Sequence, residues 1–194
     1  MTLDVRIHGR GGQGVVTAAE LLSLAAFDQG LHAQALPSFG SERTGAPVVA
    51  FCRIDEHPIR AHDPVEAPDV VVIQDPTLLR GGAVLDGLAD DGLVVVNSAR
   101  QPDELTSAGL RLRGHQRAVC LPASDLSRER LGRPLPNTAL IGAVVALTRV
   151  VELPALHTAI RQRFSGATPE VVAANLRLAT DAHDLSRGWE RGHA

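Results

Sequence analysis

The chain has 194 residues, of which 44% are hydrophobic and 21% are charged, with a formal net charge of −3. These proportions are typical of a soluble globular protein with one ordinary domain. The charge balance gives no electrostatic case for binding nucleic acid, and 3% aromatic residues provide few surfaces on which bases could stack.

Residue types that are missing exclude several kinds of chemistry. All 19 basic residues are arginine, so no lysine is present for a Schiff base, for pyridoxal phosphate or for an NTPase phosphate loop. Cys52 and Cys120 are too few thiolates for an iron–sulfur cluster, and we expect two buried free thiols. The sequence shows no signal-peptide pattern and no apolar run of transmembrane length, which predicts a cytoplasmic protein that binds no membrane.

From its first residues the sequence predicts a strand, a turn and a helix. Residues 3–8 have the apolar pattern of a strand, 9–14 form a glycine-rich turn, and 15–29 have helical spacing. A second strand at 31–36 leads into the loop 37–45.

The region after this loop breaks the alternation of strands and helices. Residues 46–54 are rich in β-forming types, and we expect 58–61 to return as a short partner strand. We interpret residues 34–61 as an antiparallel excursion that carries a loop in place of a crossover helix.

The alternation then resumes. Continuous apolar runs, which are typical of buried parallel strands, occupy residues 70–74, 93–97 and 117–121. Between the first two, residues 78–88 predict a short or broken helix because Gly81 and Gly82 interrupt it. Another helix is expected from about Ser124.

Helical patterns fill the last part of the chain. They cover residues 137–147, 153–164 and 169–185, and Asn137 is a good N-cap for the first of them. That first helix is apolar nearly all round, so it is either a central core helix or one covered partly by another subunit. From Ser186 the sequence is polar and predicts a loose tail.

Together these elements predict an α/β fold. We expect an open, mostly parallel, Rossmann-like sheet with an antiparallel excursion and with helices on both faces. Residues 1–185 would form a single domain, followed by a loose C-terminal tail at 186–194.

The glycine-rich turn is the clearest candidate site. Its residues are Gly9, Arg10, Gly11, Gly12, Gln13 and Gly14, and three of the glycines have the G-x-G-x-x-G spacing of a dinucleotide fingerprint. A dinucleotide site also needs an acidic residue at the end of the second strand, and none stands there. What remains is a loop suited to an anion, or else a tight turn with no ligand.

A second loop is expected beside the first, because the carboxyl ends of neighbouring parallel strands share one edge of a sheet. It carries Ser38, Phe39, Gly40, Ser41 and Arg43, and Arg43 is free to meet an anion or a partner's carboxylate. No His, Cys, Asp or Glu residues have metal-ligand spacing, no nucleophile elbow occurs, and the chain has no self-sufficient catalytic set.

Several ordered motifs resemble one known family. They occupy residues 9–22, 37–48, 68–79 and 137–143, with Asn97 after a buried strand between the last two. In this order they resemble the gamma subunit of pyruvate:ferredoxin oxidoreductase and of related 2-oxoacid:acceptor oxidoreductases, over roughly residues 3–180.

The resemblance implies a role within a complex. Such enzymes decarboxylate a 2-oxoacid with thiamine diphosphate and Mg²⁺, pass electrons through [4Fe–4S] clusters to ferredoxin, and make acyl-CoA from CoA. Thiamine diphosphate lies on the alpha and beta subunits and the clusters lie on the beta and ferredoxin-like delta subunits. This chain would bind none of these cofactors alone and would contribute to the CoA side of the active-site cover and to the subunit interface. The glycine-rich turn and Arg43 would face the CoA phosphates or an adjacent subunit.

Two alternatives remain open from the residues. One is a related indolepyruvate-type subunit, and the other is a free-standing nucleotide-binding or regulatory module.

Overall fold

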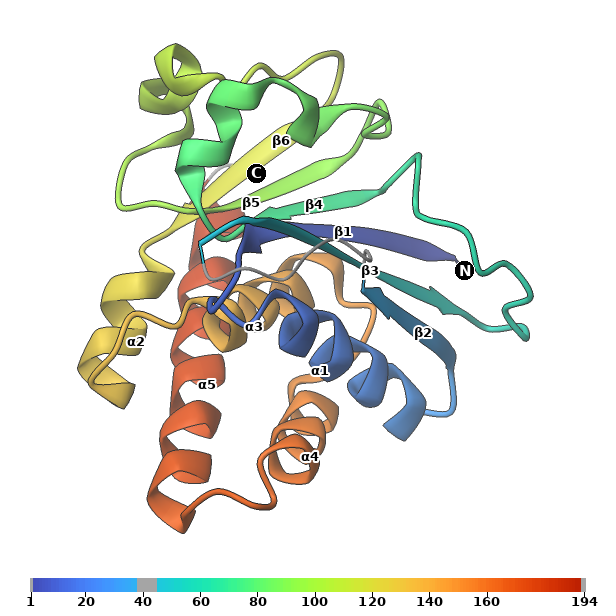
Figure 1. Cartoon of the computed structure of the whole chain (residues 1–194), viewed down its shortest axis with the longest axis vertical. Helices are drawn as coiled ribbons and strands as arrows, with labels where there is room; N and C mark the ends of the chain where they lie inside the picture. The colour runs from blue at the N-terminus through green and yellow to red at the C-terminus, as the bar shows by residue number, and fades with distance from the viewer. Residues whose placement is uncertain (1, 38–44, 193–194) are drawn as a thin grey trace.

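The computed structural model describes residues 2–37 and 45–192. Within them one sheet has the strand order β2-β3-β1-β4-β5-β6 (Figure 1). The strands are β1 (Leu3–Arg10), β2 (His32–Pro37), β3 (Pro47–Asp55), β4 (Val70–Ile73), β5 (Leu93–Asn97) and β6 (Arg117–Leu121). Strands β1, β4, β5 and β6 run parallel, whereas β3 is antiparallel to both β1 and β2. The predicted mostly parallel sheet with an antiparallel excursion is confirmed.

The expected partner strand at residues 58–61 does not form, and this prediction was wrong. The reason lies in β3, which pairs with β1 on one side and with β2 on the other over most of its length. No ladder edge of β3 is left for a further strand, so the excursion consists of β2 and β3.

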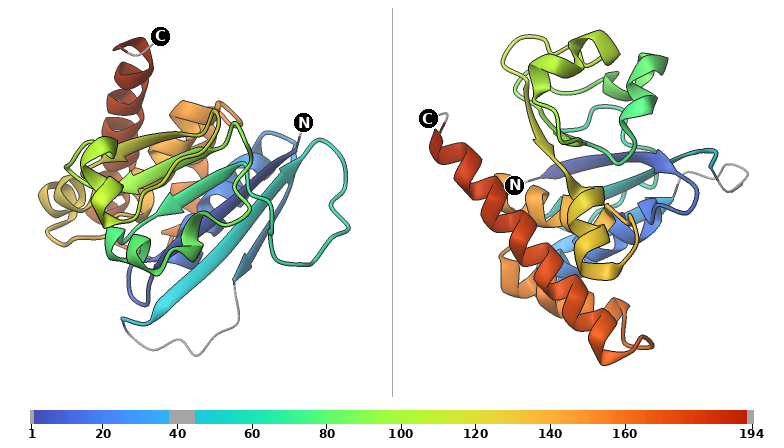
Figure 2. Two further views of the ribbon diagram at one scale, coloured as in Figure 1. Left: turned by 90° about the horizontal axis from the view of Figure 1, so that it is seen from above. Right: turned by 90° about the vertical axis from the view of Figure 1, so that its left-hand side faces the viewer.

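Helices cover the two faces of the sheet unequally (Figures 1 and 2). One face carries the α-helices, which are α1 (Val15–Asp28), α2 (Ala123–Leu131), α3 (Asn137–Thr148), α4 (Leu153–Arg163) and α5 (Pro169–Gly192). The other face carries three short 3₁₀ helices, η1 (Pro76–Gly81), η2 (Ala83–Leu85) and η3 (Pro102–Ala108). The broken helix predicted over residues 78–88 is thus η1 and η2, which meet at Gly82 in a left-handed conformation.

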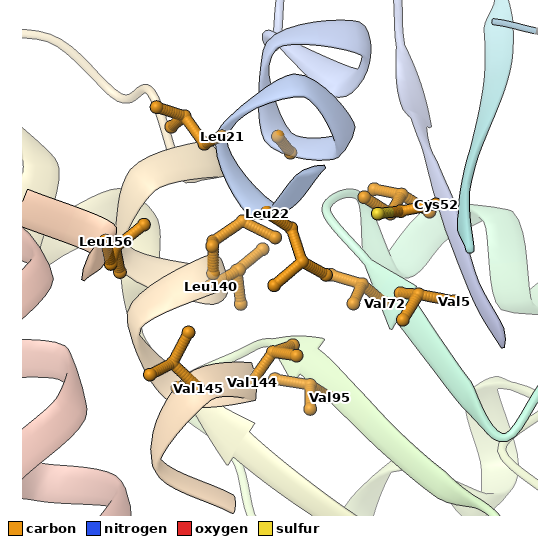
Figure 3. Close-up of a cluster of buried hydrophobic side chains, with 14 of the residues drawn as sticks. Val5, Leu21, Leu22, Cys52, Val72, Val95, Leu140, Val144, Val145 and Leu156 are labelled. Carbon is orange, nitrogen blue, oxygen red and sulfur yellow. The ribbon is translucent and has the colours of Figure 1, made fainter. Parts of the chain in front are cut away.

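Successive side chains along each strand point to opposite faces of the sheet, so each face has its own hydrophobic core. Val70, Val72 and Val95 face the α-helices, whereas Val71 and Val94 face the 3₁₀ helices. Figure 3 shows the first core, where side chains of α1 and α3 meet those of β1, β4 and β5.

Helix α3 lies in the middle of the α-helical layer. Every residue from Asn137 to Leu147 is buried. A Cβ built on Gly142 would lie 2.5 Å from the backbone oxygen of Ala179 in α5, so the two helix backbones are nearly in contact. The chain itself therefore covers α3, as the core-helix interpretation predicts.

The prediction of a loose tail from Ser186 was wrong for the described residues. Helix α5 continues through Gly192, and Ser186 is buried, with its hydroxyl donating to the carbonyl of Ala182 at 2.8 Å. The bond within the helix satisfies the hydroxyl, so a polar residue remains compatible with a buried helical position.

Candidate functional site

The glycine loop connects the end of β1 to the start of α1. Gly12 and Gly14 have φ angles of 94° and 73°, which lie in the left-handed region that favours glycine. Gly14 is the N-cap of α1, no side chain caps the helix, and its first turn has no acidic residue. The first N–H groups of α1 and the positive end of its dipole are thus available to an anion.

Asn137 joins this loop to the core. A Cβ built on Gly14 would lie 2.5 Å from Asn137 Nδ2, so the N-termini of α1 and α3 meet here. The prediction that Asn137 caps α3 was wrong, because Pro136 is the N-cap and no side chain caps the helix. The Asn137 side chain, buried against Gly14, sets the position of the loop instead.

Arg10 anchors the loop and does not project freely from it. Its Nε donates to Asp75 Oδ2 at 2.8 Å, its Nη2 to Thr77 Oγ1 at 2.9 Å and its Nη1 to the carbonyl of Gly45 at 3.1 Å. The loop backbone is fixed as well, because Arg10 N–H donates to Gln13 Oε1 at 2.8 Å. Arg10 therefore ties β1 to the segment after β4 and to the end of the second loop.

Asp75 stays ionised in this arrangement. Partial burial raises the pKa of its carboxyl, but hydrogen bonds from Thr77 and Arg10 outweigh that effect and leave the pKa below its usual value. The carboxylate both neutralises Arg10 and caps η1 by accepting from the N–H of Thr77 at 2.9 Å.

The described end of the second loop lies beside the first, as predicted. Gly11 N–H donates to the carbonyl of Ala46 at 2.9 Å, and Gly45 N–H donates to the carbonyl of Gly11 at 3.2 Å. The predicted site residues Ser38, Phe39, Gly40, Ser41 and Arg43 lie outside the described residues.

Polar groups continue along the same edge of the sheet. Asn97 at the end of β5 donates through Nδ2 to the carbonyl of Gln74 and to Ser124 Oγ, both at 2.8 Å, and its Oδ1 accepts from Ser124 N–H at 3.0 Å. Gln74 follows β4 directly and is fully buried. Sequence reasoning missed Gln74, because an amide at the end of an apolar run looks like an ordinary strand end.

A buried cation lies on the other face of β1. Arg6 is 8% exposed, and its guanidinium donates to His8 Nε2 at 3.1 Å and to backbone carbonyls that include Val84 at 3.2 Å. Burial, and after it the charge of Arg6, lowers the pKa of His8 to about 4, so the imidazole is neutral at pH 7. We assign this pair to holding η2 against the sheet.

The two cysteines remain protonated thiols at neutral pH. Both are free thiols, as predicted, but Cys52 is fully buried whereas Cys120 is only half-buried. Burial raises the pKa of both, that of Cys120 to about 11. The described residues hold no group of three or more His, Cys, Asp or Glu side chains that could bind a metal ion, and contain no helix long and apolar enough to cross a membrane.

Comparison with known proteins agrees with the resemblance in the motifs. The family model described as pyruvate ferredoxin/flavodoxin oxidoreductase matches residues 4–185. The pyruvate/ketoisovalerate oxidoreductases common subunit gamma of Pyrococcus abyssi is 43% identical over 188 residues, covering 97% of this chain and 99% of that protein. The pyruvate synthase subunit PorC of Methanosarcina barkeri is 44% identical over 81% of this chain and 84% of its own.

A solved structure extends the match to three dimensions. The crystal structure of the pyruvate oxidoreductase subunit PORC of Thermotoga maritima has a TM-score of 0.81 and 34% identity, and covers 94% of this chain and 96% of that one. The chain therefore belongs to the pyruvate ferredoxin/flavodoxin oxidoreductase family, as a subunit of the gamma type.

Proposed function

We propose that this chain is the gamma subunit of a thiamine-diphosphate- and iron–sulfur-dependent 2-oxoacid:ferredoxin oxidoreductase, with pyruvate as the 2-oxoacid, that makes acyl-CoA and CO₂. Its partners would be thiamine-binding alpha and beta subunits and a ferredoxin-like delta subunit, with ferredoxin as electron acceptor. Within this complex the glycine loop would form part of the active-site cover on the CoA side.

The observation that carries the CoA-side role is the uncapped N-terminus of α1, which lies at the point where the order of the strands reverses. The chain runs from β1 towards β2 and β3 on one side, whereas β4, β5 and β6 extend the sheet on the other. Open α/β sheets bind ligands beyond the carboxyl ends of the strands at such a switch point. The glycine loop after β1 and Gln74 after β4 lie there.

The residues of this chain do not fit the redox centres of the proposed enzyme. Cys52 lies in the core under the α-helices, whereas Cys120 packs against the core on the opposite face. The sheet separates them, so they cannot share a cluster. The clusters are accordingly assigned to partner subunits, as the resemblance in the motifs also implies for thiamine diphosphate and Mg²⁺.

The part proposed for this chain is to bind and orient CoA. The free N–H groups at the start of α1 would donate to phosphate oxygens of CoA, and the dipole of α1 would favour their negative charge. The bonds from Arg10 to Asp75, Thr77 and Gly45 hold the loop in place before CoA arrives. A fixed loop loses little conformational entropy on binding.

Alanine in place of Arg10 and of Arg43 tests this role in the intact complex. We expect the Arg43→Ala variant to raise KM for CoA by roughly tenfold or more, the cost of one charge-assisted hydrogen bond. The Arg10→Ala variant should raise it as well, because the loop loses its anchor. Steady-state kinetics with varied CoA and saturating pyruvate provide the measurement.

Arg117→Ala is the matched control, since Arg117 is exposed at the opposite end of the parallel strands. It should leave KM for CoA unchanged. If all three variants assemble and share the wild-type KM, the loops contact a partner subunit and not CoA.

A further inference from the structure

Gln74 is a buried polar side chain whose hydrogen-bonding capacity is unused. It is 0% exposed, and neither Oε1 nor Nε2 has a partner within the described part of the chain. The neighbouring amide of Asn97 is bonded on both of its side-chain polar atoms, and at the opposite end of the sheet Gln116 Nε2 donates to the carbonyls of Leu88 and Ala89 at 3.0 Å. A buried amide without partners lowers stability, so its presence calls for an explanation.

The amide of Gln74 lies directly against the glycine loop. The position of a Cβ built on Gly9 is 3.1 Å from Gln74 Oε1, 3.0 Å from Gln13 Oε1 and 2.6 Å from Val15 Cγ2. Because Val15 is the first residue of α1, the unused amide lies beside the N-terminus of that helix. The free N–H groups at the start of α1 and the unpartnered amide of Gln74 thus lie side by side where β1 and β4 end.

We propose that Gln74 is a ligand-binding residue that donates from Nε2 to an anionic oxygen of the phosphate type, held jointly by the N–H groups at the start of α1. A rotation of the amide presents Nε2 in place of Oε1. Gln13 Oε1 lies over the same point and accepts from the N–H of Arg10, so an entering anion would displace this side chain while the side-chain bonds of Arg10 keep the loop in place. The proposal rests on the proposed function only for CoA as the natural source of the phosphate.

Replacement of Gln74 by methionine, which has similar length and no amide, tests this assignment. In the full chain without ligand, Gln74→Met should raise Tm by about 2–4 °C, because an unsatisfied buried amide has been removed. The same variant should bind inorganic pyrophosphate, measured by titration calorimetry, roughly tenfold more weakly than the wild type. Gain of stability together with loss of affinity is the signature of a residue that awaits a ligand.

Gln116→Met is the matched control, because its amide is already bonded within the chain. It should lower Tm and leave pyrophosphate affinity unchanged. Three outcomes overturn the proposal: a lower Tm for Gln74→Met, unchanged affinity in that variant, or no binding of pyrophosphate to the wild type. If pyrophosphate binds through Gln74 but CoA does not compete with it, the anion site stands and the proposed CoA role fails.

Discussion

The Gly14→Ala variant is expected to raise KM for CoA at least tenfold in the assembled complex and to lower the stability of the subunit by about 2–4 kcal/mol. Two independent costs add at this position. Gly14 has a φ of 73°, which an L-residue adopts at a cost, and its new Cβ would lie 2.5 Å from Asn137 Nδ2 and 2.9 Å from Asn137 Cγ. Asn137 is 6% exposed and has little room to move, so the start of α1 must shift.

Gly12→Ala separates these two costs. Gly12 also has a positive φ, 94°, but a Cβ built there meets nothing within 4 Å. This variant should lose only about 1–2 kcal/mol. Urea unfolding of the subunit and CoA kinetics of the complex measure both quantities, and equal values for Gly12→Ala and Gly14→Ala would show that contact with Asn137 does not position the loop.

The Gly142→Ala variant is expected to lose about 2 kcal/mol or more of folding stability, despite the better helix propensity of alanine. The added methyl group would lie 2.5 Å from the backbone oxygen of Ala179, and a backbone atom cannot rotate away as a side chain can. Helix α3 is enclosed between the sheet and α5, so separating the helices opens the core.

Gly188→Ala is the control for helix propensity, because Gly188 lies in α5 and a Cβ built there meets nothing within 4 Å. It should gain about 0.5–1 kcal/mol. A stability for Gly142→Ala at or above the wild-type value in urea unfolding would mean that α3 and α5 are not packed as closely as described.

Strong periodic patterns made much of the fold predictable. Residues 70–73 and 93–96 are apolar throughout because β4 and β5 have cores on both faces, and this pattern is typical of a central parallel strand. The tail was missed because Ser186 satisfies its hydroxyl inside the helix, which a polar sequence does not reveal.

The candidate site was predictable in its backbone but not in its side chains. The glycines of the loop follow from the left-handed angles that a tight strand-to-helix turn requires. The side-chain contacts depend on which segments the fold brings together. Asp75, which binds Arg10, is 65 positions away in the sequence, and Asn137, which packs on Gly14, is also distant. The sequence does not reveal that the buried amide of Gln74 has no hydrogen-bond partner among the described residues, because this depends on its three-dimensional surroundings.

Reconstitution of the complex tests the central claim most directly. Alpha, beta and delta subunits purified without this chain should oxidise pyruvate with ferredoxin slowly and without saturable dependence on CoA, and addition of this chain should restore a saturable, CoA-dependent rate. The same CoA-dependent rate with and without the chain, at the same KM for CoA, would contradict the assignment of the glycine loop to the CoA side of the active site.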